Sequence, residues 1–333
     1  MRPFAYVRAA TANDAISALA AGGAGTRLIA GGTTLYDLMK LDVETPSTVV
    51  DLTGIDELAT FDTSNARELT FGALARMSDV AGDARLTREY PALAESLWKA
   101  ASQQVRNMAT VGGNLLQRTR CAYFRNGEPY PCNKRQPGSG CAAIGGIDRQ
   151  HAVLGGSDAC IAVYAGDWAV ALVAFDAQVD VAGPKGQRTL PLETLHREPG
   201  ATPHIETTLA PDELILRIRV PASGVGRGST YHKIRDRESY AFALASAAAA
   251  VQLEGDIIRE ARIALGGVAT RPWRAREAER LLIGRPLTAD LAREASQAAF
   301  AGAAPGQHNR YKVELGILTV ADALLIAGER AVR

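Results

Sequence analysis

All four cysteines of this 333-residue chain lie in one 40-residue window, at Cys121, Cys132, Cys141 and Cys160. The segment around them, residues 115–156, lacks hydrophobic periodicity and is rich in proline and glycine. A structureless loop of that length inside a compact domain requires a reason. We therefore expect a metal centre or covalent links between the cysteines to organise this segment.

The spacing of the cysteines does not identify the centre. Ten, eight and eighteen residues separate them, which fits neither a zinc ribbon with paired C-x-x-C knuckles nor the compact ferredoxin pattern. Four thiolates are the ligand set of a 4Fe-4S cluster and also of a structural zinc site. The cysteines could instead form two disulfides or stay as free buried thiols, and disulfides are disfavoured in a chain made in the cytosol.

Composition excludes several classes of function. The chain has 37 basic and 36 acidic side chains and a formal net charge of +1, so no overall field favours nucleic acid or an anionic membrane. The N-terminal residues lack the pattern of a secretory signal, and no apolar run is long enough to span a bilayer. We expect a cytoplasmic protein, or a periplasmic one if a signal-bearing partner subunit exports it.

The first half of the chain alternates between strand and helix patterns. A capped helix is expected from Thr11 or Asn13 to Leu19, a strand over 27–30, a helix over 35–41, strands over 49–52 and 69–74, and a helix over 90–104. After the cysteine segment, regular structure resumes at 168–175, as an apolar strand, and at 178–181. A strand over 213–220 then precedes a linker at 221–226.

The second half reads as strands followed by helices. Strands are expected at 230–234, 240–251 and 258–265, and helices from Trp273, Thr288 and Tyr311. The fold class is therefore α+β, with two domains at 1–222 and 227–333 and a cysteine-bearing insertion at about 115–160. The small residues of 240–250 indicate a tightly packed strand.

Two glycine pairs suggest a site for a nucleotide. Gly31-Gly32 follows the strand over 27–30, and Gly112-Gly113 stands in the motif from Ala109 to Asn114. Such pairs let successive backbone N–H groups converge on an anion, and each is weak evidence when taken alone. No G-x-G-x-x-G opens a helix with an acidic residue about 20 positions further on, so the chain lacks a Rossmann fingerprint.

Taken together, these motifs resemble those of the FAD-binding subunits of molybdenum hydroxylases, the xanthine dehydrogenase and aldehyde oxidoreductase family. The segment from Leu28 to Leu35 resembles the first pyrophosphate loop and Ala109 to Asn114 the second, while 213–221 and 231–234 match later signatures. The resemblance covers nearly the whole chain. It implies an FAD domain of the vanillyl-alcohol-oxidase type, followed by a sheet-plus-helices domain of the CO dehydrogenase flavoprotein type.

The resemblance also implies specific flavin contacts. The diphosphate would bind to the two loops, Ala101 would lie beside the ring, Asp167 would accept from a ribose or adenine donor, and Lys233 would lie near the pyrimidine edge. Without the resemblance, Asp167 could be a helix or strand cap, and Lys233 a surface lysine paired with Asp236. The full set is Leu28, Ile29, Ala30, Gly31, Gly32, Thr33, Thr34, Leu35, Ala101, Thr110, Gly113, Asn114, Asp167, Ile215 and Lys233.

The resemblance bears on the cysteines too. In most such subunits only a short segment separates the residues that correspond to Asn114 and Asp167. Here they are 53 positions apart, so about forty residues look inserted. A minority branch of the family, which includes periplasmic aldehyde oxidoreductase, carries a 4Fe-4S cluster in such an insertion, with the four cysteines as ligands. Nearby cations would offset the charge of the thiolates: Arg118, Arg120, Arg125, Lys134 and Arg135.

The implied function is electron relay. A large partner subunit with a molybdenum cofactor would oxidise an aldehyde, a small partner subunit with 2Fe-2S clusters would carry the electrons, and FAD in this chain would pass them to an external acceptor. Competing hypotheses are a flavin subunit acting with a xanthine, N-heterocycle or aroyl-CoA hydroxylase, a self-sufficient flavoenzyme, and a zinc-stapled nucleotide-binding scaffold. The five scattered histidines read as structural, and no catalytic acid, base or nucleophile stands out in the sequence.

Overall fold

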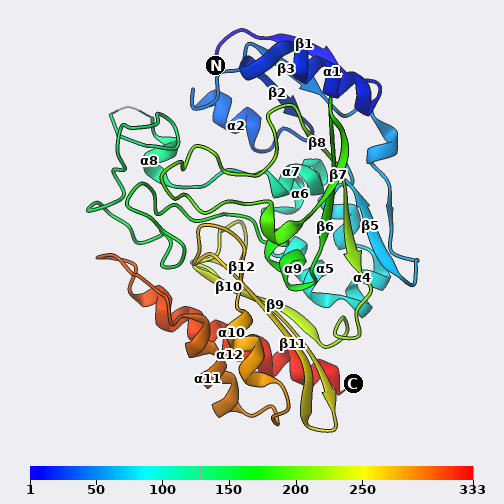
Figure 1. Ribbon diagram of the computed structural model, residues 1–333, viewed down its shortest axis with the longest axis vertical. Coiled ribbons are helices and arrows are strands. Elements are labelled where there is room, and N and C mark those ends of the chain that lie inside the picture. The colour runs from blue at the N-terminus through cyan, green and yellow to red at the C-terminus, as the bar shows by residue number, and fades with distance from the viewer. Residues whose placement is uncertain (128, 333) are drawn as a thin grey trace.

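A computed structural model describes residues 1–127 and 129–332, and its elements form three sheets (Figure 1). The first is a small parallel sheet in the order β1-β3-β2, with β1 at Ala5–Arg8, β2 at Thr26–Ile29 and β3 at Thr48–Asp51. Helix α1, Ala12–Gly22, packs on this sheet, and Thr11 caps it in a capping box with Asp14. The Thr11 cap predicted from the sequence is confirmed.

The second sheet is antiparallel, in the order β4-β5-β8-β6-β7. Its strands are β4 Phe61–Asp62, β5 Glu68–Gly72, β6 Gln178–Gly183, β7 Gly186–Pro191 and β8 Leu214–Pro221. Along the second half of β8, Ile218 and Val220 are buried while Arg217 and Arg219 point outward, as the alternation predicts. Five helices lie between β5 and the insertion: α3 Met77–Ala81, α4 Ala84–Glu89, α5 Pro91–Trp98, α6 Gln103–Met108 and α7 Val111–Leu115.

Two of the predicted elements in this half were wrong. The single helix expected over 90–104 is two helices, α5 and α6, separated by Ala101 in the left-handed region at φ 48°. The strand expected over 168–175 is helix α9, Trp168–Ala174, in which all seven residues are buried. A helix covered on every side shows no polar face, so a short apolar run does not reveal its period.

The third sheet is antiparallel, in the order β12-β11-β10-β9, with β9 at Ser229–Ile234, β10 at Ala245–Glu254, β11 at Ile257–Gly266 and β12 at Trp273–Arg274. Helices α10 Arg276–Leu282, α11 Ala289–Ala299 and α12 Tyr311–Ala331 cover one face (Figure 1). The sequence predicted a strand from Tyr240 and a helix from Trp273. Both starting points were wrong, because 240–244 is a loop and Trp273 lies in β12.

The small residues of β10 lie where two layers meet. Ala247 and Ala249 face the helices of the C-terminal half, whereas Ala248 and Ala250 join the core that holds α5 and α9. Both faces of the strand are therefore buried, and alanine lets both layers approach closely. The tightly packed strand predicted from the sequence is confirmed.

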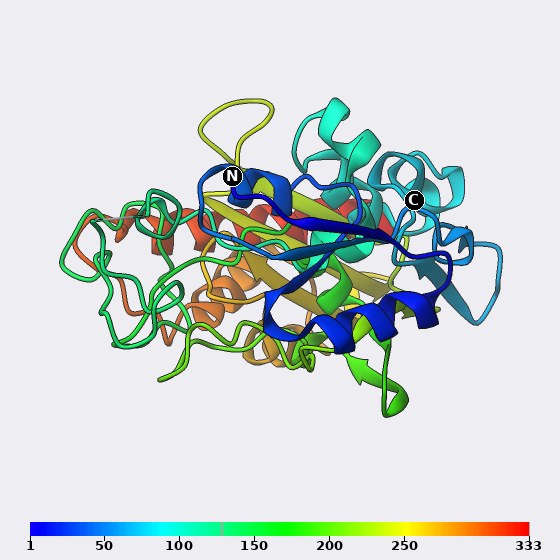
Figure 2. The ribbon, with the colours of Figure 1, turned by 90° about the horizontal axis from the view of Figure 1, so that it is seen from above.

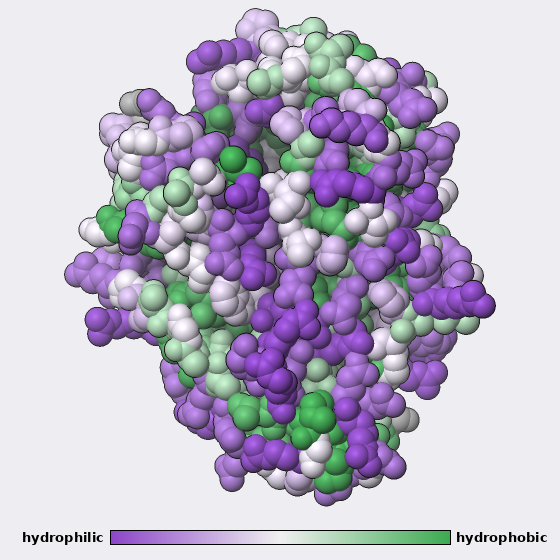
Figure 3. All heavy atoms as spheres, in the orientation of Figure 1, coloured by the Kyte–Doolittle hydropathy of each residue, from purple (hydrophilic) through white to green (hydrophobic). Residues whose placement is uncertain are grey.

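The cysteine segment extends to one side of the molecule, where it forms loops around the short helix α8, Ala122–Arg125 (Figures 1 and 2). Isolated bridges join Cys132 to Cys141 and Ser157 to Cys160. Hydrophilic residues predominate on the face seen in Figure 3, with apolar groups scattered between them. Within residues 1–127 and 129–332, no helix has the length and apolar character needed to cross a bilayer.

Candidate functional site: two backbone loops, a cavity and four thiols

The first glycine loop follows β2 and precedes α2, Leu35–Lys40. Gly32 adopts φ 70°, a conformation that favours glycine. A Cβ atom on Gly31 would lie 1.8 Å from the carbonyl oxygen of Met108 and 3.1 Å from the nitrogen of Ala109. The first loop thus meets the backbone that leads into the second motif.

The second glycine loop is a single short helix turn. Thr110 caps it by accepting from the Gly113 N–H at 3.3 Å, and Gly112 packs so closely on Ala73 that a Cβ atom would lie 2.8 Å from it. The side-chain oxygen of Asn114 is buried, and the residues that the structure describes offer it no hydrogen-bond partner. A buried unsatisfied acceptor favours a ligand donor at this place.

Two predicted loops are therefore brought together, because Gly31 contacts the residues immediately before Thr110. Backbone amides and a glycine on each side suit a diphosphate, which needs close approach and N–H donors. Ile215 lies on β8, close to the second loop. The carbonyl of Leu216, the next residue on that strand, accepts from the N–H of Ala73, and Gly112 packs against Ala73.

Asp167 and Lys233, predicted separately, form a buried ion pair. Lys233 Nζ lies 2.8 Å from Asp167 Oδ2, with side chains 1% and 6% exposed. The hydroxyl of Tyr231 donates to Asp167 Oδ1 at 2.7 Å, and Lys233 also donates to the carbonyl of Lys99 at 2.9 Å. Burial, followed by the charge of Asp167, raises the pKa of Tyr231 well above its usual value, so the phenol stays protonated.

This arrangement corrects one interpretation of the sequence. Lys233 does not pair with Asp236, which binds Arg149 at 3.0 Å instead. Both oxygens of Asp167 already accept from protein donors, so it can reach a ligand only through its remaining lone pairs. Sequence reasoning did not select Tyr231 as a site residue. It precedes the histidine of the 231–234 motif, and only the register of strand β9 could have revealed its contact with Asp167.

A cavity of about 680 Å³ lies between the insertion and the loop over 236–244. None of the predicted flavin contacts lines it, but Gly166, which precedes Asp167, does. Tyr164 also lines it and donates to the carbonyl of Leu115 at 3.1 Å, next to Asn114. The cavity therefore adjoins the second glycine loop, and tertiary packing alone creates it.

Aromatic and cationic groups dominate the cavity walls. Arg120 lies over the ring of Phe242 at 4.9 Å, and Arg237 over that of Tyr240 at 5.5 Å. Arg120 Nε is buried and has no hydrogen-bond partner among the described residues. Such walls suit a planar ligand that carries negative charge or carbonyl acceptors. Sequence reasoning did not identify Phe242 or Tyr240 as site residues.

The four cysteines lie together in the insertion. All are free thiols that line one small cavity; Cys132 and Cys160 are buried, and Cys121 and Cys141 are half-buried. In the part of the chain that the structure describes, no group of three or more His, Cys, Asp or Glu side chains is arranged to hold a metal ion. Four thiols in one cavity supply the ligand number of either a structural zinc ion or a 4Fe-4S cluster.

The surroundings of the thiols influence their ionisation. Burial raises the pKa of Cys121 to about 12 and also raises that of Cys160, against which the charge of Lys134 acts. A further group lies beside Cys121: the Nε2 atom of His151 is 3.2 Å from its sulfur. Sequence reasoning treated this histidine as structural because it shows no ligand spacing.

The cations near the cysteines are mostly paired with carboxylates. Glu206 binds Arg118 and Lys134, Glu44 also binds Arg118, and Asp37 binds Arg120 and Arg125. Arg135 donates instead to four backbone carbonyls of the insertion. Four of the five cations are thus paired with three carboxylates, so the positive charge that offsets the thiolates is smaller than the sequence alone indicates.

Comparison with known proteins identifies the family. The family model described as the FAD binding domain in molybdopterin dehydrogenase matches residues 2–223, and that of the CO dehydrogenase flavoprotein C-terminal domain matches residues 229–325. The chain belongs to the FAD-binding subunits of the molybdenum hydroxylase family. It is accordingly an oxidoreductase subunit with an FAD-binding domain.

Individual relatives agree with that family. The aldehyde oxidoreductase FAD-binding subunit PaoB of Escherichia coli is 45% identical over 333 residues, which cover 99% of this chain and all of PaoB. The glyceraldehyde dehydrogenase medium chain of Sulfolobus acidocaldarius is 28% identical, with 87% of this chain and 85% of that one covered. Among solved structures, carbon monoxide dehydrogenase of Hydrogenophaga pseudoflava matches with a TM-score of 0.77, 26% identity and 99% coverage of both chains.

Proposed function

We propose that this chain is the FAD and 4Fe-4S electron-transfer subunit of a heteromeric, molybdenum-dependent aldehyde oxidoreductase. The relatives that bear on the substrate class are an aldehyde oxidoreductase subunit and a glyceraldehyde dehydrogenase chain. The observation that carries the proposal is that Cys121 lines both the thiol cavity and the larger cavity beside the glycine loops. A cluster held by the thiols would then be a neighbour of a flavin held by the loops.

The proposed flavin site has two parts. The loops at Gly31 and Gly113 would bind the diphosphate through backbone N–H groups, and the unsatisfied oxygen of Asn114 would accept from the ligand. The isoalloxazine ring would occupy the cavity of about 680 Å³, between Tyr164 and the loop that carries Tyr240. There the Asp167–Lys233 ion pair, behind Gly166, would fix the cavity wall.

The proposed cluster site rests on the four thiols and on the shape of the insertion. A cubane cluster binds each cysteine through a different iron, so its ligands lie farther apart than those of one zinc ion. Cys121, Cys132, Cys141 and Cys160 share a cavity, and backbone N–H groups point at two of the sulfurs. Such hydrogen bonds stabilise thiolates and tune a cluster.

In this proposal the chain performs no acid, base or nucleophilic step. FAD supplies the change between two-electron and one-electron chemistry, and the protein binds it, orients it and excludes water. Aldehyde oxidation would take place on a large partner subunit with the molybdenum cofactor, and a small partner subunit with 2Fe-2S clusters would connect the two centres. Electrons would leave this chain to an external acceptor.

Cofactor analysis of the purified complex tests the proposal. We expect one FAD and about four irons in this chain, beyond those of the small subunit, with flavin bands and a broad iron-sulfur shoulder in the visible spectrum. One zinc per chain and no such iron would disprove the cluster and leave the flavin site standing. A colourless chain would contradict both.

Co-purification tests the partners. A tagged copy of this chain, expressed together with its neighbouring genes, should still be bound to a molybdenum subunit and a 2Fe-2S subunit after size-exclusion chromatography. An isolated monomer that oxidises aldehydes at the full rate would contradict the electron-transfer role, because this chain would then contain the substrate site.

A further inference from the structure

His151 occupies a place that the proposed electron-transfer function leaves unexplained. Its side chain is buried, at 5% exposure, and its Nε2 atom lies 3.2 Å from the sulfur of Cys121. The other ring nitrogen, Nδ1, is buried and has no hydrogen-bond partner among residues 1–127 and 129–332. Within the part of the chain that the structure describes, the imidazole therefore makes a single polar contact, and that contact is with a proposed cluster ligand.

The chemistry of a ligating cysteine determines the direction of this contact. A cysteine bound to iron is a thiolate and has no hydrogen to donate. The Nε2 atom must then carry the hydrogen, and the neutral imidazole leaves Nδ1 bare.

The backbone around His151 is anchored by the C-terminal half of the chain. The amide of Asn309, which is fully buried, donates to the carbonyls of His151 and Ala152 at 3.3 and 3.2 Å. The carboxylate of Asp148 accepts from the backbone N–H groups of Gln307 and His308 at 3.0 and 2.7 Å. These bonds hold the turn over 148–152 against the segment that leads into α12, so the position of the imidazole does not depend on the loops of the insertion alone.

We propose that His151 is a positioning residue that donates its Nε2–H to the sulfur of Cys121 and thereby raises the reduction potential of the cluster. The inference rests on the proposed 4Fe-4S site. A hydrogen bond to a ligating sulfur withdraws electron density and stabilises the more negative, reduced state. Since Cys121 also lines the cavity proposed for the flavin, this bond acts on a ligand that borders the proposed electron partner.

A spectroscopic experiment tests the contact in the unaltered complex. Protein labelled with ¹⁵N-histidine is reduced, and pulsed EPR is recorded on the 4Fe-4S signal, which its fast relaxation separates from the 2Fe-2S signals. We expect a weak ¹⁵N coupling that disappears in the H151Q complex. No coupling would overturn the proposal, and so would a strong coupling of the kind given by an imidazole bound directly to iron.

Potentiometry tests the effect. The midpoint potential of the cluster should fall in H151L, fall less in H151Q because glutamine keeps an N–H donor, and stay unchanged in H232L. His232 is the matched control, since it lies on β9 and faces Asp322 at 3.8 Å, away from the insertion. An H151L complex with its full iron content and the wild-type potential would overturn the inference, whereas a wild-type complex with no 4Fe-4S signal would overturn the proposed cluster itself.

Discussion

At Gly31 the absence of a side chain brings the two glycine loops together. A methyl group there would overlap the carbonyl of Met108, at 1.8 Å from Cβ, and the neighbour is backbone that cannot move away alone. We predict that G31A weakens FAD binding at least about tenfold, which corresponds to ~1.4 kcal/mol. The ratio of flavin to protein absorbance in the purified chain measures the effect.

The control for this prediction is G302A. A Cβ atom on Gly302 would meet none of the described residues within 4 Å, and its φ lies outside the region that favours glycine. This variant should keep its flavin. Normal flavin content in both variants would show that the close approach at Gly31 is not needed for binding.

Lys312 contributes a pH dependence to stability. Its side chain, 1% exposed on α12, donates to the carbonyl of Gly267 at 2.7 Å, and burial with the charge of Arg149 lowers its pKa to about 7. In the unfolded chain a lysine titrates near 10.4. Between these two pKa values the unfolded state binds more protons than the folded state. The free energy of unfolding therefore rises with pH, by at most ~1.4 kcal/mol per pH unit.

Urea unfolding of wild type and K312M at several pH values from 7 to 9 checks this prediction. The free energy of unfolding of the wild type should increase relative to that of K312M as the pH rises, because the variant has lost the titrating group. A difference between the two proteins that does not vary with pH would contradict the lowered pKa.

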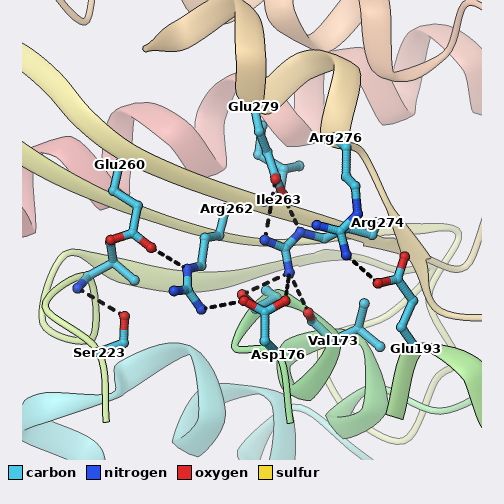
Figure 4. Close-up of polar contacts among 12 residues, drawn as sticks. Val173, Asp176, Glu193, Ser223, Glu260, Arg262, Ile263, Arg274, Arg276 and Glu279 are labelled. Atoms are coloured by element: carbon cyan, nitrogen blue, oxygen red, sulfur yellow. Dashed lines mark hydrogen bonds and ion pairs between the residues drawn. The ribbon is translucent and has the colours of Figure 1, made fainter. Parts of the chain in front are cut away.

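Helix α9 is held at its C-terminal end by one arginine (Figure 4). Arg274, 4% exposed, donates to the carbonyls of Val173 and Ala174 at 2.6 and 3.2 Å, binds Asp176 at 3.0 Å and pairs with Glu279. Loss of this side chain takes a donor from two helix-end carbonyls and from the partly buried carboxylate of Glu279, which keeps the backbone N–H of Ile263. We predict that R274M lowers the free energy of unfolding by about 3 kcal/mol, measured by chemical denaturation.

A matched arginine on α10 separates this role from a general charge effect. Arg280 pairs with Glu277, and both side chains are about 70% exposed. R280M should therefore change stability by less than about 0.5 kcal/mol. Equal losses in the two variants would mean that Arg274 does not stabilise the end of α9.

At the scale of the whole molecule, the insertion is attached to the rest of the chain by ion pairs. Asp37 on α2 binds Arg120 at 3.0 Å and Arg125 at 2.8 Å, and α2 directly follows the first glycine loop. On the other side, Lys134 binds Glu206 at 2.8 Å. The loops that contain the cysteines thus connect to the proposed flavin site, although the insertion has little regular structure of its own.

A metal centre that organises this segment should stabilise it locally. We predict that C132S, or removal of iron with a chelator, makes residues 116–160 exchange amide hydrogens at least about tenfold faster, because metal binding and folding are coupled in small segments. Peptides from β10 and β11 are the internal reference and should keep their protection. Unchanged exchange in the insertion would mean that the loops fold without the centre.

Several features of this protein could be predicted from the sequence because they depend on neighbours in the chain. The capping box at Thr11, the glycine pair after β2, the alternation in β8 and the clustering of the cysteines are all local patterns. The resemblance supported by these patterns led to the family that the comparisons established. The division into residues 1–222 and 227–333 and the individual cofactor contacts remain predictions.

Tertiary structure decided what depends on contacts between distant segments. The buried helix α9 resembles a strand in sequence because its environment, rather than its own pattern, hides every face. Lys233 could be placed beside Asp167 only by the packing of β9 near α9, 66 positions away, and His151 beside Cys121 only by the folding of the insertion. The sequence determines which side chains are present, whereas packing determines which of them are buried and come into contact.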